Sequence, residues 1–225
     1  MQEQFDFYSQ MLNILLQKTS NEKINFTHIT KWHESHPYYR LNYYNGIQIS
    51  QVLGIYLLFN KDYLSRFDNI VEIGSYNGGL SSYIFDTKKP EAKFVSYDIV
   101  PEINETKKNR NDIDFRIGDC FEQPQFDEIV AMIQSPGRTL MICDGGFKTR
   151  EFNDFSVHLK KDDVIILHDY KQEDKSFMEA KEYWQWPYSF ETCYEDIKDA
   201  IEKNGLEEYD NKTANFFMWG SFVKK

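Results

Sequence analysis

The sequence is poor in cysteine and in long apolar runs, and both shortages exclude familiar classes of protein. Three cysteines, Cys120, Cys143 and Cys193, stand far apart in 225 residues and form no CxxC pair. Their spacing argues against a zinc site or a redox motif and predicts reduced thiols in the core or near the site. The longest apolar stretch, Val52 to Phe59, is far shorter than the roughly 20 residues that a membrane-spanning helix needs. Because the first residues also lack a basic flank before an apolar run, we expect a cytoplasmic protein without membrane association.

Basic residues are also in the minority. The chain has 26 Lys and Arg against 36 Asp and Glu, which gives a formal net charge of −10. An acidic chain repels phosphate backbones, and its lysine pairs are scattered rather than gathered in one stripe, so we expect no nucleic-acid partner. Low-complexity tracts and Gly/Ser linkers are absent as well. Since 41% of the residues are hydrophobic, the chain can bury one sizeable core, and one compact unit is predicted.

The middle of the chain, from about Asn69 to Tyr170, alternates short apolar runs with amphipathic polar segments. This alternation is typical of an α/β protein in which helices connect parallel strands. Helical spacing also appears near residues 5–16 and 52–63, a helix start at 176–179, and a helix at 190–201 that Gly205 ends. The tail, residues 214–223, is predicted to form closing strands as a hairpin at the sheet edge. The predicted strands of the sheet are residues 70–73, 94–97, 113–116, 140–143 and 164–167.

A loop with two glycines follows the first predicted strand. Residues 72–79 read EIGSYNGG, and glycines at 74 and 78 allow the backbone to approach a ligand closely. In open α/β sheets, ligands bind at the carboxyl ends of the strands, which is where this loop stands. The GxxxG spacing differs from the GxGxxG of dinucleotide binders and argues against a nicotinamide cofactor. A purely structural strand-to-helix turn is the alternative.

Two further acids stand at the ends of the next strands. Asp98 follows the second strand, where a carboxylate can accept both hydroxyl hydrogens of a ribose. Its alternative role is a cap for the segment that follows. Asp119 follows the third strand and can receive an adenine amino group, or it is simply a turn residue.

With these motifs, the chain from about Gly46 to its C-terminus resembles the class I S-adenosylmethionine-dependent methyltransferases. The resemblance implies a Rossmann-like, doubly wound sheet of seven strands whose last strand is antiparallel, with an N-terminal helical cap. Residues 1–66 would form this cap and a lid, and residues 67–225 the S-adenosylmethionine-binding domain. Glu72 would neighbour the methionine amino group. The other implied cofactor contacts are Gly74, Ser75, Tyr76, Gly78, Asp98, Ile99, Asp119, Cys120 and Asp144.

The second half of the chain narrows the resemblance. Residues 140–147, LMICDGGF, and 164–170, VIILHDY, are similar to small-molecule O-methyltransferases whose motifs read I-D-G-x-H and then H-D-Y or D-D. Residues 46–51 resemble, more loosely, a segment of cephalosporin-hydroxylase-like and macrolide-sugar methyltransferases. The position of the family's histidine after D-G-x is occupied here by Phe147. Whatever this histidine does in the relatives, this protein must do in another way or not at all.

In metal-using members of this group the first and the last acid bind a divalent cation. The resemblance therefore implies a metal site, with Mg²⁺ expected, at Asp144, His168 and Asp169. Two carboxylates beside an imidazole suit a hard cation that retains water and takes up an acceptor's hydroxyl oxygens. His168 or Lys148 would be the base, with Asp144 as the third catalytic residue. A capping role for Asp144 and a turn histidine are the structural alternatives.

The expected function is transfer of a methyl group from S-adenosylmethionine to a hydroxyl of a small metabolite or sugar, with help from a divalent metal. Two alternatives remain open at this point. One is a hydroxylase-like member of the same family that transfers no methyl group. The other is a binding or assembly module without turnover, which the departure at Phe147 permits. A homo-oligomer is compatible with the sequence.

Overall fold

The computed structural model describes residues 24–26, 42–44, 47–49, 62–100, 110–172, 192–216 and 219–225. The helical pattern expected near residues 5–16, residues 52–61 of the second pattern, and the helix start at 176–179 lie outside these described residues. In the part of the chain that is described, no helix combines the length and the apolar composition that crossing a membrane requires.

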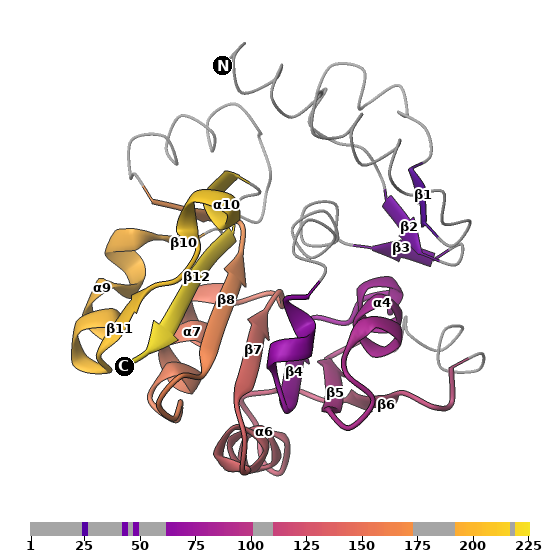
Figure 1. Cartoon of the computed structure of the whole chain (residues 1–225). Coiled ribbons are helices and arrows are strands. Elements are labelled where there is room, and N and C mark those ends of the chain that lie inside the picture. Colours follow the sequence, from indigo (N-terminus) through magenta and orange to yellow (C-terminus); the bar gives the residue numbers. More distant parts are fainter. Residues whose placement is uncertain are drawn as a thin grey trace.

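A seven-stranded mixed sheet forms the centre of the molecule, in the order β11-β12-β8-β7-β4-β5-β6 (Figure 1). Five strands run parallel, and β12 is antiparallel to both of its neighbours. This confirms the predicted doubly wound, Rossmann-like sheet with an antiparallel last strand. The strands are β4 (Asn69–Ile73), β5 (Lys93–Asp98), β6 (Asp114–Ile117), β7 (Thr139–Cys143), β8 (Val164–His168), β11 (Leu206–Glu208) and β12 (Trp219–Lys224).

Helices cover both faces of the sheet. One face packs against η1 (Leu64–Arg66), α4 (Gly79–Thr87) and α10 (Asn211–Phe216). The other packs against α6 (Gln125–Gln134), α7 (Lys148–Ser156) and α9 (Tyr194–Lys203). Because both faces are covered, the central strands β4 and β7 are buried at every position. Continuous apolar runs in the sequence are the expected signature of such strands.

The hairpin predicted within residues 214–223 is not formed, and only the second part of this tail is a strand, which lies between β11 and β8. Residues 219–224 form β12, which pairs with β11, but residues 211–216 form the short helix α10 rather than a strand. Ala214 of this helix is fully buried against the sheet. A short apolar run is compatible with either a strand or a buried helix, and tertiary packing selects the helix here.

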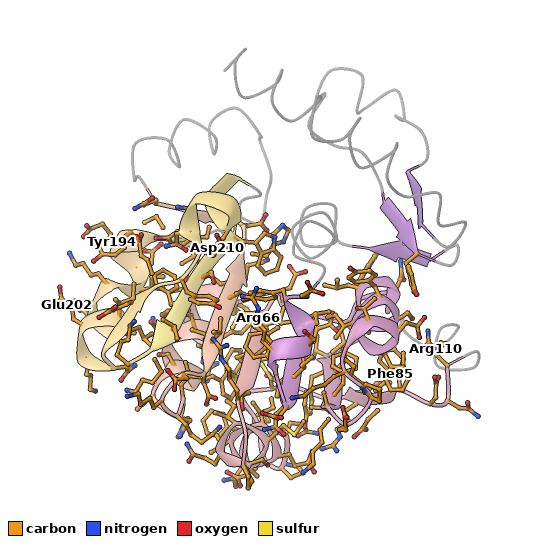
Figure 2. All side chains as sticks on the ribbon, in the orientation of Figure 1. Arg66, Phe85, Arg110, Tyr194, Glu202 and Asp210 are labelled. Atoms are coloured by element: carbon orange, nitrogen blue, oxygen red, sulfur yellow. The ribbon has the colours of Figure 1, made fainter. Side chains whose placement is uncertain are left out.

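A small antiparallel sheet stands beside α4 and was not part of the predicted helical cap. It consists of β1 (Ile24–Phe26), β2 (Asn42–Tyr44) and β3 (Ile47–Ile49), and β2 and β3 contact α4. The hydroxyl of Tyr44 donates to the Asp86 carboxylate at 2.7 Å. Arg110 pairs with Asp86 at 2.8 Å and lies over the ring of Phe85, at 5.3 Å from its centroid (Figure 2). The Tyr44 hydroxyl thus attaches the small sheet to α4, and Arg110 holds the carboxylate that accepts from it.

Candidate active site

The sheet order reverses at β4, which has β5 on one side and β7 on the other. At the carboxyl ends of these strands lies a cavity of about 520 Å³, a volume typical of small-molecule sites. Glu72 and Gly78, both expected at the cofactor, are not among the residues that line it. The expected site residues that do line the cavity are Gly74, Ser75, Tyr76, Asp98, Ile99, Asp119, Cys120, Asp144, Lys148, His168 and Asp169.

Gly74 brings two loops of the cavity into contact. Its φ of 94° lies in the left-handed region, and a Cβ at this position would come within 2.1 Å of the Asp144 carbonyl oxygen. The Asp144 N–H also donates to the Ile73 carbonyl at 2.9 Å. A glycine at position 74 is therefore required for Asp144 to stand beside the loop that follows β4.

Asp98 is oriented by backbone donors. One carboxylate oxygen accepts from the Tyr76 N–H at 2.6 Å, and the other from the Val100 N–H at 3.0 Å. Each oxygen keeps a second acceptor position, so the carboxylate can still receive ligand hydroxyls. The Tyr76 and Ile99 side chains, 56% and 64% exposed, stand at the rim of the same cavity. The site thus combines a hydrogen-bond acceptor in a fixed orientation, the Asp98 carboxylate, with apolar walls.

Glu72 lies beneath the glycine-containing loop that follows β4 rather than in the cavity. It is fully buried, and its Oε2 accepts from the hydroxyls of Ser81 and Ser96, both at 2.5 Å. Its Oε1 has no hydrogen-bond partner among the described residues. Burial raises the pKa of Glu72 to about 7. Ser96 also shares a hydrogen bond with Ser75 of the loop, so Glu72 reaches the loop through this chain of hydroxyls.

Asp144, Lys148, His168 and Asp169 meet at one end of the cavity. His168 Nδ1 lies 2.8 Å from Asp144 Oδ1, and its Nε2 lies 3.5 Å from Asp169 Oδ1. The imidazole stacks on Trp219 with 4.6 Å between the ring centroids. Lys148 Nζ lies 3.3 Å from Asp169 Oδ2. The structure therefore brings together all the residues expected to be catalytic or to bind metal.

The carboxylates favour the charged forms of both basic side chains. Burial alone would lower the pKa of Lys148 and of His168. The nearby charges of Asp169 and Asp144 outweigh burial, and both pKa values are raised. Neither side chain is thereby prepared to accept a proton, which weakens the sequence-based hypothesis that one of them is the base.

The donor set does not fit a divalent cation in this arrangement. Asp144 is hydrogen-bonded to His168, and Asp169 is paired with Lys148, so the carboxylates that a cation needs already have partners in the chain. Across the described residues, no group of three or more His, Cys, Asp and Glu side chains has the arrangement to hold a metal ion. In this arrangement the charged groups at this end of the cavity are the side chains of Asp144, Lys148, His168 and Asp169 themselves.

One site residue escaped the sequence interpretation. Glu151, in the first turn of α7, is 1% exposed and lines the cavity. Its carboxylate accepts from the backbone N–H groups of Gly145 at 3.2 Å and Phe147 at 3.1 Å, and burial raises its pKa to about 7. It shapes the loop between Asp144 and Lys148. An acid in the first turn of a helix was the available signal, because such acids bind free N–H groups there.

No protein-family model matches this chain, and no curated protein matches it in sequence. Its structure is similar to that of CmcI with Mg and SAM, with a TM-score of 0.57, 17% identity and 95% of each chain covered. The apo structure of CmcI gives a TM-score of 0.56 at 18% identity, over 81% of this chain and 75% of that chain. TomG, an O-methyltransferase from Streptomyces achromogenes involved in tomaymycin synthesis and solved with SAM, gives 0.50 at 11% identity, over 95% and 96%. At these identities the similarity establishes a common fold.

Proposed function

We propose that this chain, which shares its fold with S-adenosylmethionine-dependent methyltransferases, transfers a methyl group from that cofactor to a hydroxyl oxygen of a small molecule. The observation that carries the proposal is the cavity at the reversal of strand order. There the oriented carboxylate of Asp98 and the charged cluster around Asp144 line one space of about 520 Å³. A nucleoside at one end and an acceptor at the other make use of both features.

In this proposal the cofactor lies along the carboxyl ends of β4, β5 and β6. Asp98 receives the ribose hydroxyls at its remaining acceptor positions. Asp119 accepts the Phe121 N–H at 2.9 Å and holds its own loop in place beside the adenine. Glu72 acts from beneath, by fixing the loop that surrounds the methionine part. The proposed direct cofactor contacts, all of which line the cavity, are Gly74, Ser75, Tyr76, Asp98, Ile99, Asp119, Cys120 and Asp144.

Catalysis then depends mainly on position and charge. The sulfonium is an activated methyl donor, so the protein has to align an acceptor oxygen behind the methyl carbon. Asp144, Lys148 and His168 stand at the end of the cavity where this oxygen would bind. The Mg²⁺ that the family resemblance implies would have to separate Lys148 from Asp169.

Calorimetry with S-adenosylhomocysteine tests the cofactor site. We expect the wild-type chain to bind it and Asp98→Ala to bind roughly 10- to 100-fold more weakly, because hydrogen bonds to a charged group are lost. Asp127→Ala, an exposed position on α6, is the matched control and should bind as the wild type does. A wild-type chain that does not bind this compound would overturn the proposal.

Mass analysis of the product tests the reaction class. Transfer of a methyl group adds about 14 mass units to the acceptor, whereas a hydroxylase-like relative would add about 16 for one oxygen. A gain of 16 would replace the methyltransferase proposal with the alternative.

A further inference from the structure

We propose that the ammonium of Lys148, in place of a divalent cation, donates a hydrogen bond to the oxygen of the molecule that is methylated. We further propose that this molecule, the methyl acceptor, carries a single acidic hydroxyl of the phenol or enol type. This inference rests on the proposed function and concerns the acceptor end of the same cavity.

Lys148 is held in place by its own neighbours. The residue is 9% exposed, it begins α7, and it lines the cavity. Its ammonium donates to the Gly145 carbonyl at 3.0 Å and pairs with Asp169 at 3.3 Å. An ammonium has three N–H donors, and these two acceptors are its partners among the described residues. One donor therefore remains for an oxygen bound in the cavity.

A divalent cation at the expected position would have to break two existing contacts. It would displace Lys148 from Asp169 and His168 from Asp144, where the nitrogen and oxygen atoms are 3.3 Å and 2.8 Å apart. The displaced ammonium would then remain close to a second, doubly charged cation in a site with little solvent. Repulsion between like charges is strong where water is excluded. The chain's own cation thus occupies the place of the metal.

A lysine in the place of the dication restricts the class of methyl acceptor. Two neighbouring hydroxyls of a sugar or a catechol gain nothing from their spacing when no metal is present to chelate them, and an alkyl hydroxyl stays neutral. A phenol ionises near pH 10, as tyrosine does, and a nearby positive charge lowers that pKa further. A single ammonium is therefore sufficient for a phenolic or enolic hydroxyl.

The walls of the cavity suit a flat acceptor. Phe147, where the family has histidine, is 57% exposed and lines the cavity, as does Tyr76 at 56% exposure. Exposed aromatic side chains at a cavity offer large apolar surfaces on which a planar ring can pack. Phe147 directly precedes Lys148, so the same short segment supplies an apolar wall and the cation.

The chemical step balances without a metal. The acceptor binds as its oxyanion after releasing its proton to solvent. A lone pair of this oxygen forms the new O–C bond, the C–S bond breaks, and its electron pair returns to sulfur. The sulfonium becomes the neutral thioether of S-adenosylhomocysteine, the charge of the oxyanion is lost, and Lys148 keeps its proton throughout.

Metal titration tests the role of Lys148 independently of turnover. Mg²⁺ and Mn²⁺ are titrated by calorimetry into the full chain saturated with S-adenosylhomocysteine. We expect Lys148→Ala to bind the ions at least 10-fold more tightly than the wild type, because Asp169 is released from its ion pair. Lys161→Ala, an exposed lysine after α7, is the control and should match the wild type. Equal or weaker metal binding by Lys148→Ala would overturn the proposal.

A second variant, Lys148→Met, tests the proposal in case Lys148→Ala does not fold. Lys148→Met keeps the length of the side chain without its charge, and unchanged affinity for S-adenosylhomocysteine shows that the variant is folded. Tighter metal binding by this folded variant supports the proposal, and wild-type metal affinity overturns it. If the wild type does not bind S-adenosylhomocysteine at all, the proposed function fails, while the same titration without that compound still tests Lys148.

Turnover of simple acceptors tests the acceptor class. With a chelator present, we expect methylation of monophenols at a rate that added Mg²⁺ does not raise. Lys148→Met should lower kcat roughly 100-fold while leaving KM for S-adenosylmethionine nearly unchanged, and Lys148→Arg should restore part of the rate. A rate that the chelator abolishes and Mg²⁺ restores would overturn the proposal, as would a preference for vicinal diols.

Discussion

Replacing Glu72 with glutamine should change how the stability of the protein depends on pH. Glu72 is fully buried, and its pKa is raised from 4.5 to about 7. A carboxyl whose pKa is higher in the folded than in the unfolded state binds its proton more tightly when folded. Its contribution to stability is therefore complete below pH 4.5 and is lost as pH rises toward 7 and above. Over the interval from pH 5 to pH 8 this linkage lowers the free energy of unfolding by roughly 2 to 3 kcal/mol.

Glutamine at position 72 cannot ionise, so this loss disappears in the variant. Its carbonyl oxygen can still accept from Ser81 and Ser96, as Oε2 does in the wild type. The amide nitrogen would take the place of Oε1, which has no partner among the described residues, and this adds a cost that does not vary with pH. The difference in stability between Glu72→Gln and the wild type should therefore shift in favour of the variant by roughly 2 to 3 kcal/mol from pH 5 to pH 8.

Urea unfolding at pH values from 5 to 8 measures this difference. Comparing two chains that differ at one position cancels the contribution of other groups, including Glu151, whose pKa is also raised to about 7. Glu122→Gln, at an exposed position before α6, is the control and should follow the wild type at every pH. A constant difference between Glu72→Gln and the wild type over this range would refute the reasoning, because it would mean that the buried carboxyl has an ordinary pKa.

Two further predictions concern the loops around the cavity. Gly74→Ala should lower the free energy of unfolding by roughly 2 to 4 kcal/mol, since its Cβ would overlap the Asp144 carbonyl at a left-handed φ. Gly146→Ala, where a Cβ meets no atom within 4 Å, should be nearly neutral in the same urea experiment, and equal effects would contradict the close approach. Glu151→Ala should weaken S-adenosylhomocysteine binding about 10-fold in calorimetry, because two loop N–H groups lose their acceptor, and unchanged affinity would exclude that role.

Much of the fold was predictable because the sheet leaves a simple trace in the sequence. Strands covered on both faces are continuous apolar runs, and each of the five parallel strands was predicted to within two residues at either end. The carboxyl ends of parallel strands meet at one edge, which is why Asp98, Asp144 and Asp169 could be expected together. The small N-terminal sheet left no comparable trace, since its strands are only three residues long.

The orientation of Glu72 was decided by strand alternation rather than by its motif. Along β4, Ile70 and Glu72 face α4, whereas Val71 and Ile73 face the opposite core. Ser96 is the partner of Glu72 in the pairing of β4 with β5, so both side chains point to the same face. Side chains along a strand alternate between its two faces, and this alternation predicts that Glu72 points to the same face as Ile70. The resemblance to a motif does not predict this, because it aligns residues without saying which way they point.

The pairing of Lys148 with Asp169 depends on a backbone conformation that the motif does not reveal. Asp169 has a φ of 54°, in the left-handed region, directly after β8. This conformation lets its carboxylate meet the ammonium of Lys148, which begins α7. An acid after a strand is recognisable in a sequence, but a positive φ at a residue other than glycine is not, because tertiary contacts select it.

Tyr76 is the costlier of the two residues other than glycine that have a positive φ at the cavity. Aspartate adopts a positive φ readily, as Asp162 and Asp210 also do, whereas a bulky residue such as tyrosine adopts it only at a cost of roughly 1 to 3 kcal/mol. The bond from the Tyr76 N–H to the Asp98 carboxylate, 2.6 Å long, offsets part of that cost. The same bond orients Asp98 before any ligand arrives. Tyr76 orients the Asp98 carboxylate through its N–H, and the left-handed conformation of Asp169 brings that residue's carboxylate to Lys148, so at both positions the backbone conformation fixes the place of a charge at the cavity.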